Sequence, residues 1–186
     1  MVFNVRYAIA VLISLACAST ARADSLTPDP FAKGSRAWSV TAGASCDPSI
    51  AWVYSTQIGV SYYVADNLAL EYGAIAGYVN AKRTEGGVLG GPELGLRWHV
   101  AKSRRWSTYL EGLVGMVLQQ SPITADTLRF NFNLQPGGGV TYRLNNEVMV
   151  QSGFRWHHLS NGRIRGKEHN FGYDGPMLYL GLRRSF

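Results

Sequence analysis

Hydrophobic and polar side chains alternate along eight segments of this 186-residue chain. Such alternation predicts β-strands, because successive side chains of a strand point to opposite faces of a sheet. Each segment has about the ten residues that a tilted strand needs to cross a bilayer. The segments cover residues 36–44, 52–64, 68–79, 93–100, 106–118, 129–143, 148–160 and 177–186.

Short and longer connections alternate between these segments. The short turns cover residues 65–67, 101–105 and 145–147, and the longer loops cover 45–51, 80–92, 119–128 and 161–176. This arrangement is typical of an up-and-down barrel. The last residue, Phe186, ends an alternating apolar segment and resembles the C-terminal signature of bacterial outer-membrane barrels. We therefore expect an all-β fold, an eight-stranded antiparallel up-and-down transmembrane β-barrel with a polar packed interior.

Several charged residues occupy positions that the alternation assigns to the inside of the barrel. Unpaired charges there would be costly, so we expect them to neutralise one another in a polar plug. A barrel of this size has room for side chains but not for a wide channel. A catalytic cluster of Glu93, Arg97 and Glu111 is the alternative, and the plug is favoured. The inward charged residues are Glu71, Glu93, Arg97, His99, Glu111 and Arg155.

The beginning of the chain has the features of an export signal. Arg6 precedes a short apolar stretch over residues 8–18, and a small-x-small cleavage pattern ends at Ala23. We expect a signal peptide over 1–23 and the barrel over 24–186. The barrel part would keep one cysteine, Cys46, and so no intrachain disulfide. The net charge of +6 favours an anionic membrane surface as a partner over nucleic acid, which an exported protein rarely meets.

The segment over 148–160 carries a histidine and a serine two positions apart, His158 and Ser160. Residues i and i+2 of a strand share a face, so an imidazole nitrogen can reach the hydroxyl. Polar groups on the lipid-facing wall cost free energy, which makes the pair unusual there. We interpret it as a general base and a nucleophile, and the alternative is contact with lipid headgroups. The face is otherwise apolar, with Val148, Val150, Phe154 and Trp156.

A carboxylate completes this arrangement. The alternation of the last strand, extended toward its beginning, places Asp174 outward and near His158. Its role would be to hold the imidazole tautomer and to stabilise the imidazolium. Glu168 is the rival acid, in a loop where alternation predicts nothing. The sequence therefore predicts a triad of Ser160, His158 and Asp174 on the outer wall.

The run from His158 to Gly162, followed by Asn170 to Asp174 and an aromatic-ended strand, resembles the lipid A 3-O-deacylases. The resemblance implies a bacterial outer-membrane esterase with its site toward the outer leaflet. Its substrate would be the ester-linked 3-hydroxyacyl chain at position 3 of lipid A. The family's His-x-Ser motif falls on His158 and Ser160, and Asp174 stands where the family usually has glutamate. Asn161, with Gly162, matches the family's proposed oxyanion donors.

Three cations, Arg163, Arg165 and Lys167, follow the serine closely. They could clamp the phosphates of lipopolysaccharide, or form a solvated loop in an anionic leaflet. The spacing of the nearby histidines and carboxylates matches no common zinc pattern, so we expect no metal or cofactor. These histidines and carboxylates are His157, His158, Glu168, His169 and Asp174.

Two other classes of function compete with the deacylase. One is an outer-membrane acyl hydrolase or acyltransferase that acts on phospholipid. The other is a non-catalytic small barrel that serves adhesion or envelope stability. The sequence leaves the oligomeric state open, a homodimer included.

Overall fold

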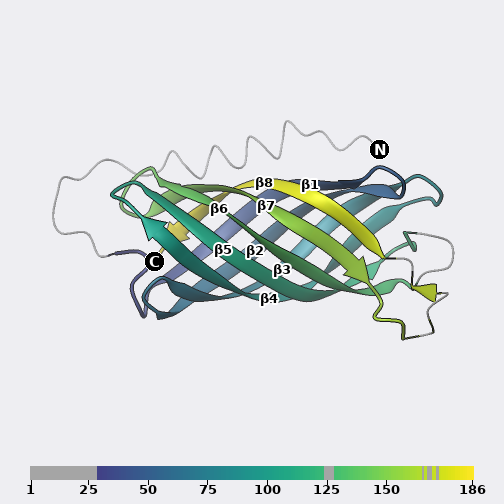
Figure 1. Cartoon of the computed structure of the whole chain (residues 1–186), viewed down its shortest axis with the longest axis horizontal. Coiled ribbons are helices and arrows are strands. Elements are labelled where there is room, and N and C mark those ends of the chain that lie inside the picture. Colours follow the sequence, from purple (N-terminus) through teal and green to yellow (C-terminus); the bar gives the residue numbers. More distant parts are fainter. Residues whose placement is uncertain (1–28, 124–127, 165, 167–168, 171) are drawn as a thin grey trace.

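The computed structural model describes residues 29–123, 128–164, 166, 169–170 and 172–186, so the expected signal peptide lies outside the described residues. In the described part, eight antiparallel strands close into a barrel in which β1 pairs with β8 (Figure 1). The expected eight-stranded barrel is confirmed. Its strands are β1 (Arg36–Asp47), β2 (Ala51–Ala65), β3 (Leu68–Ala81), β4 (Gly87–Lys102), β5 (Trp106–Gln119), β6 (Phe130–Arg143), β7 (Val148–Ser160) and β8 (Tyr173–Ser185).

Two strands begin several residues earlier than the alternation predicted. β4 starts at Gly87 instead of residue 93, and β8 starts at Tyr173 instead of residue 177. The start of β4 was hidden because Gly90, Gly91 and Pro92 show no hydrophobic alternation, although they pair with β3. The early start of β8 places Asp174 within a strand, where its direction is fixed by the pleat.

The two ends of the barrel differ. β1 begins and β8 ends at what we call the terminal end, where the connections cover residues 66–67, 103–105 and 144–147. The opposite, loop end holds the connections over 48–50, 82–86, 120–129 and 161–172. The first of these is shorter than the loop predicted over 45–51. There the Asp47 carboxylate accepts hydrogen bonds from the backbone N–H and hydroxyl of Ser49, which closes a tight turn.

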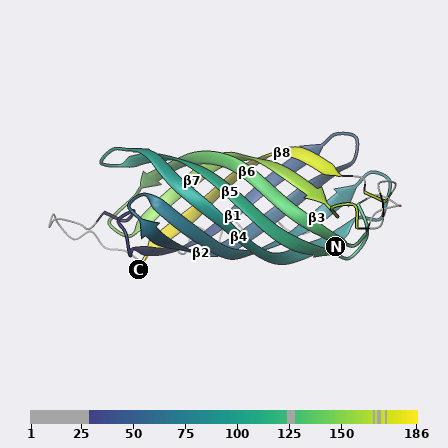
Figure 2. The same ribbon diagram turned by 60° about the horizontal axis from the view of Figure 1, so that its bottom comes forward.

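The outer wall of the barrel is apolar. Outward side chains such as Leu118, Leu178 and Ile58 are 67%, 70% and 62% exposed. The strands are tilted and run around the whole closed wall (Figure 2). In the described residues, no helix has the length and apolar character to cross a membrane. An apolar belt of this kind on a closed barrel has no exposed sheet edge and suits a lipid surround.

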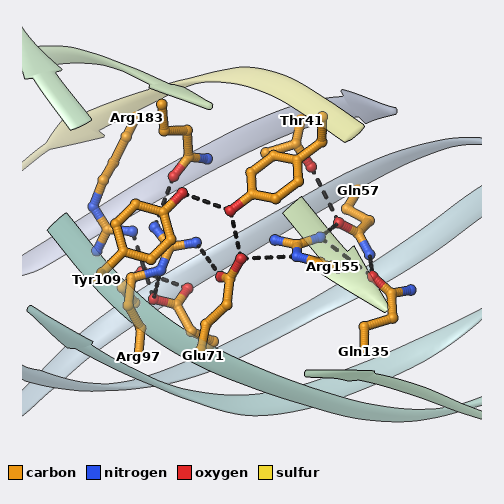
Figure 3. Close-up of polar contacts among 12 residues, drawn as sticks. Thr41, Gln57, Glu71, Arg97, Tyr109, Gln135, Arg155 and Arg183 are labelled. Atoms are coloured by element: carbon orange, nitrogen blue, oxygen red, sulfur yellow. Dashed lines mark hydrogen bonds and ion pairs between the residues drawn. The ribbon is translucent and has the colours of Figure 1, made fainter. Parts of the chain in front are cut away.

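Charged side chains fill the lumen and pair with one another (Figure 3). The Glu111 carboxylate lies 2.8 Å from both the Arg97 and the Arg155 guanidinium. Glu71 lies 3.5 Å from Arg97 and from Arg183. These contacts form the expected plug, in which Glu71 and Glu111 each lie beside two arginines.

Glu93 differs from Glu71 and Glu111, because the side chains that donate hydrogen bonds to its carboxylate are amides. It accepts hydrogen bonds from the side chains of Asn133, Gln57 and Gln135. Glu93, Arg97 and Glu111 are all buried, at 2–7% exposure. Access to a lipid substrate is therefore closed to them, and they belong to the plug.

Candidate active site

His158 and Asp174 lie side by side on the outer wall near the loop end. The register of β7 and β8 pairs these two residues directly, and Ser160 follows two positions along β7. The pleat points all three side chains outward, while the buried His157 and Leu159 point inward. The side chains of His158 and Asp174 are 33% and 47% exposed. The structure thus brings together the three residues that alternation had assigned to one face.

A chain of two hydrogen bonds joins the three side chains. His158 Nδ1 lies 2.8 Å from the Asp174 Oδ1, and His158 Nε2 lies 3.0 Å from the Ser160 Oγ. A carboxylate on Nδ1 favours the tautomer that carries its proton there. Nε2 is then free to accept the Ser160 proton, at a distance within the range for general-base catalysis.

Trp156 is a further member of this arrangement that the sequence reasoning missed. Its indole Nε1–H donates a hydrogen bond of 2.9 Å to the Asp174 Oδ1, the same oxygen that His158 contacts. Alternation placed Trp156 on the correct face, but a cross-strand hydrogen bond depends on register. The signal that could have found it is the diagonal relation of Trp156 to the residue paired with His158.

Strand β6 supplies an apolar border on the other side of the triad. Phe132 pairs with Ser160, and Leu134 pairs with His158; each is 43% exposed. The ring of Phe130 packs edge-on against that of Phe132, with centroids 5.3 Å apart. An apolar chain could therefore lie beside the hydroxyl on this side.

Asn161, expected to be an oxyanion donor, makes hydrogen bonds within the loop that follows Ser160. Its backbone N–H donates to the Asn170 side-chain oxygen at 2.9 Å, and its side-chain Nδ2–H donates to the His169 carbonyl at 2.6 Å. Its side-chain oxygen accepts from the Arg163 N–H at 2.9 Å. Asn161 is also buried, at 1% exposure. It therefore ties down the loop after Ser160 through its backbone N–H and one of its two side-chain N–H groups.

Gly162 follows with a left-handed backbone, at φ +64°, and Arg163 continues it at φ +62°. Among the described residues, no acceptor bonds the Gly162 backbone N–H. Arg163 is exposed. Arg165, Lys167 and the rival acid Glu168 lie outside the described residues. Within the described ranges, no group of three or more histidine, cysteine or acidic side chains could hold a metal ion.

Solved structures of outer-membrane barrels share this fold. Neisserial surface protein A matches with a TM-score of 0.58 at 14% identity, over 82% of this chain and 96% of that one. OprG from Pseudomonas aeruginosa matches with a TM-score of 0.53 at 16% identity, over 83% and 97%. The N-terminal barrel of Pseudomonas aeruginosa OprF matches with a TM-score of 0.51 at 13% identity, over 83% and 98%. No curated protein sequence matches the chain.

The closed barrel of this chain, with its apolar wall and polar plug, thus has the fold of outer-membrane barrels. The sequence also shows the family to which the chain belongs. Residues 41–183 match the model of the family described as lipid A 3-O-deacylase (PagL), and the chain belongs to that family. The match spans both β7 and most of β8, which carry Ser160, His158 and Asp174.

Proposed function

We propose that this protein is an outer-membrane serine esterase that removes the ester-linked 3-hydroxyacyl chain at position 3 of lipid A. Membership of the lipid A 3-O-deacylase family supports the reaction. The observation that carries the proposal to named residues is the hydrogen-bonded chain from Ser160 through His158 to Asp174. That geometry has the nucleophile, base and orienting acid of a serine hydrolase.

In the proposed reaction, His158 Nε2 takes the proton of Ser160 as Oγ attacks the ester carbonyl. Asp174 stabilises the imidazolium that forms. The tetrahedral intermediate then collapses as His158 gives the proton to the sugar oxygen, which leaves as an alcohol. Water, deprotonated by the same imidazole, attacks the acyl-enzyme and releases the hydroxy fatty acid, and Ser160 regains its proton.

The position of the site on the wall suits a substrate held in the bilayer. The ester of a lipid lies close to the headgroup region, and the triad lies near the loop end beside exposed Phe132 and Leu134. We propose that the loop end faces the outer leaflet, so that the acyl chain runs along the apolar wall. The sugar would then lie next to the loop over 161–172.

The backbone N–H of Gly162 is the preferred oxyanion donor in this proposal. It stands two residues after Ser160 and has no acceptor among the described residues, whereas the backbone N–H of Asn161 already donates to Asn170. One such donor is typically worth about 3–4 kcal/mol in the transition state. Arg163, and with it Arg165 and Lys167, would contact the phosphates of lipid A.

The test is the mass spectrum of lipid A from bacteria that produce the protein. Loss of one hydroxyacyl chain from lipid A is the expected result. The Ser160→Ala variant should not remove the chain, although its barrel should still fold and show the heat-dependent change in gel mobility. The exposed loop serine Ser49, changed to alanine, is a matched control that should stay active. Altered phospholipids with intact lipid A would favour the other acyl hydrolase. No change in either lipid would favour a non-catalytic barrel.

A further inference from the structure

We infer that Trp156 is a positioning residue that holds the triad carboxylate in place through its indole N–H. This inference rests on the proposed function, because it assigns Trp156 a part in the same site. The observation is that Asp174 Oδ1 receives two donors, Trp156 Nε1 at 2.9 Å and His158 Nδ1 at 2.8 Å. Neither the expected motif nor the alternation required a second donor there.

The register of the strands explains how the indole reaches the carboxylate. His158 pairs with Asp174, and Trp156 pairs with Pro176 on the same face. Trp156 therefore stands diagonal to Asp174, at a separation that long aromatic side chains can span. Directly opposite the ring is a compact proline, so the indole can lean toward the acid. Trp156 and His158, on the same face of β7, thus both contact the Oδ1 of Asp174 on β8.

The apolar character of the wall makes this second hydrogen bond important for the Asp174 carboxylate. The Asp174 side chain is 47% exposed on a face whose other members are mainly apolar. A carboxylate in that setting has few donors, and hydrogen bonds to its charged form stabilise it. With His158 alone, the carboxylate could rotate toward headgroups or water. The indole fixes its rotamer, and the fixed oxygen in turn fixes the imidazole that serves Ser160.

The ordinary role of an outward tryptophan in a barrel is to anchor the wall at the membrane interface. The chain has five tryptophans, and Trp52 and Trp156 have almost equal exposure, 44% and 45%. Among the described residues, Trp156 is the one whose indole donates to a carboxylate. Trp52 instead stacks on Tyr54 near the loop end of β2, with centroids 6.2 Å apart. Trp52 is therefore a matched control for anchoring alone.

The experiment measures deacylation of purified lipid A by the refolded full-length barrel in detergent micelles. Trp156→Phe keeps an aromatic ring and removes only the donor. We expect kcat to fall about tenfold or more, the size of a hydrogen bond to a charged group, with little change in KM. Trp52→Phe should leave both constants unchanged. The heat-dependent gel shift of each variant reports whether its barrel has formed.

A double-mutant cycle distinguishes positioning from general disturbance of the wall. Asp174→Ala removes the acceptor of the indole hydrogen bond. If Trp156 acts through Asp174, then Trp156→Phe should have no further effect on the residual activity of Asp174→Ala. Three outcomes would overturn the positioning role of Trp156 while leaving the proposed function intact. They are an equal loss of kcat with and without Asp174, an equal loss of kcat in Trp52→Phe, and an unchanged kcat in Trp156→Phe. An inactive wild-type barrel would overturn the proposed function and this role with it.

Discussion

Charged and titratable side chains of this barrel lie in two settings, the lumen and the outer wall. Their exposure and their hydrogen-bond partners differ between these settings. In the lumen the Glu111 side chain is fully buried between Arg97 and Arg155, whose side chains are 2–3% exposed. On the wall His158 and Asp174 remain one-third to one-half exposed. Opposite charges balance each other in the lumen, whereas the wall holds a directed chain of hydrogen bonds that ends at a hydroxyl. The candidate active site therefore differs from the plug in its exposure on the outer wall, and not in the presence of charge.

The two settings also differ in how their contacts are built. The plug includes contacts between strands that are not neighbours in the barrel, as between Arg155 on β7 and Glu111 on β5. The wall triad lies on two adjacent strands, and its members are at most 16 positions apart. Loss of a plug residue should therefore weaken the whole barrel, and loss of a wall residue should affect the reaction alone.

The largest expected effect is on the wall. Asp174→Ala removes the group that orients His158, so kcat should fall about ten-thousandfold, as the loss of a triad acid does elsewhere. Because Asp174 is part-exposed and outside the plug, its removal should leave urea unfolding nearly unchanged. Deacylation of lipid A, followed by mass spectrometry, measures kcat. The gel mobility of the barrel after incubation at increasing urea concentrations measures its unfolding. Activity near that of the wild type would show that another acid serves His158.

A matched change in the lumen should have the opposite pattern. Glu111→Ala leaves Arg97 and Arg155 without their shared partner, which should lower the free energy of unfolding by about 3–5 kcal/mol. Molecules that remain folded should deacylate at the normal rate. Urea titration monitored by tryptophan fluorescence provides the measurement, with the exposed loop residue Glu85→Ala as its control. Equal stability of the two variants would contradict the account of the plug.

A change in the loop after Ser160 tests whether Asn161 supports the reaction or the stability of the barrel. Asn161→Ala removes the side-chain hydrogen bonds that tie Asn161 to His169 and Arg163. We expect kcat to fall roughly tenfold to a hundredfold, because displacements of about 1 Å at a catalytic site can cost that much. The unfolding curve should move little, since no plug contact is lost. A loss that appears only in unfolding would reassign Asn161 to the scaffold.

The smallest effect is expected at the exposed edge of the site. Arg163→Glu should raise KM for lipid A by about two- to fivefold, the size of an exposed ion pair, and leave kcat unchanged. Arg83→Glu, on the exposed loop between β3 and β4, is the matched control. Kinetics with substrates that carry or lack phosphate would show whether the effect depends on that group. Equal values for both variants would favour a solvated loop.

Much of the site could be predicted because a strand has a simple period. Alternation alone placed His158, Ser160 and Asp174 on one face, and the structure brings these side chains into contact. The start of β4 could not be found in this way, because Gly90 and Gly91 contribute no side chain to the pattern. The pairing of Asn161 with Asn170 was equally hidden, since it depends on how the loop folds back.

The sequence by itself determined the number of strands, the inward and outward faces, and the family of this protein. These follow from local rules, a two-residue period and a short motif, that need no knowledge of distant contacts. Only the tertiary structure decided which arginine meets which glutamate in the lumen, and that the Trp156 indole donates to Asp174. The physical reason is that such contacts depend on strand register and barrel closure, which set the distances between side chains that the chain keeps far apart or on separate strands.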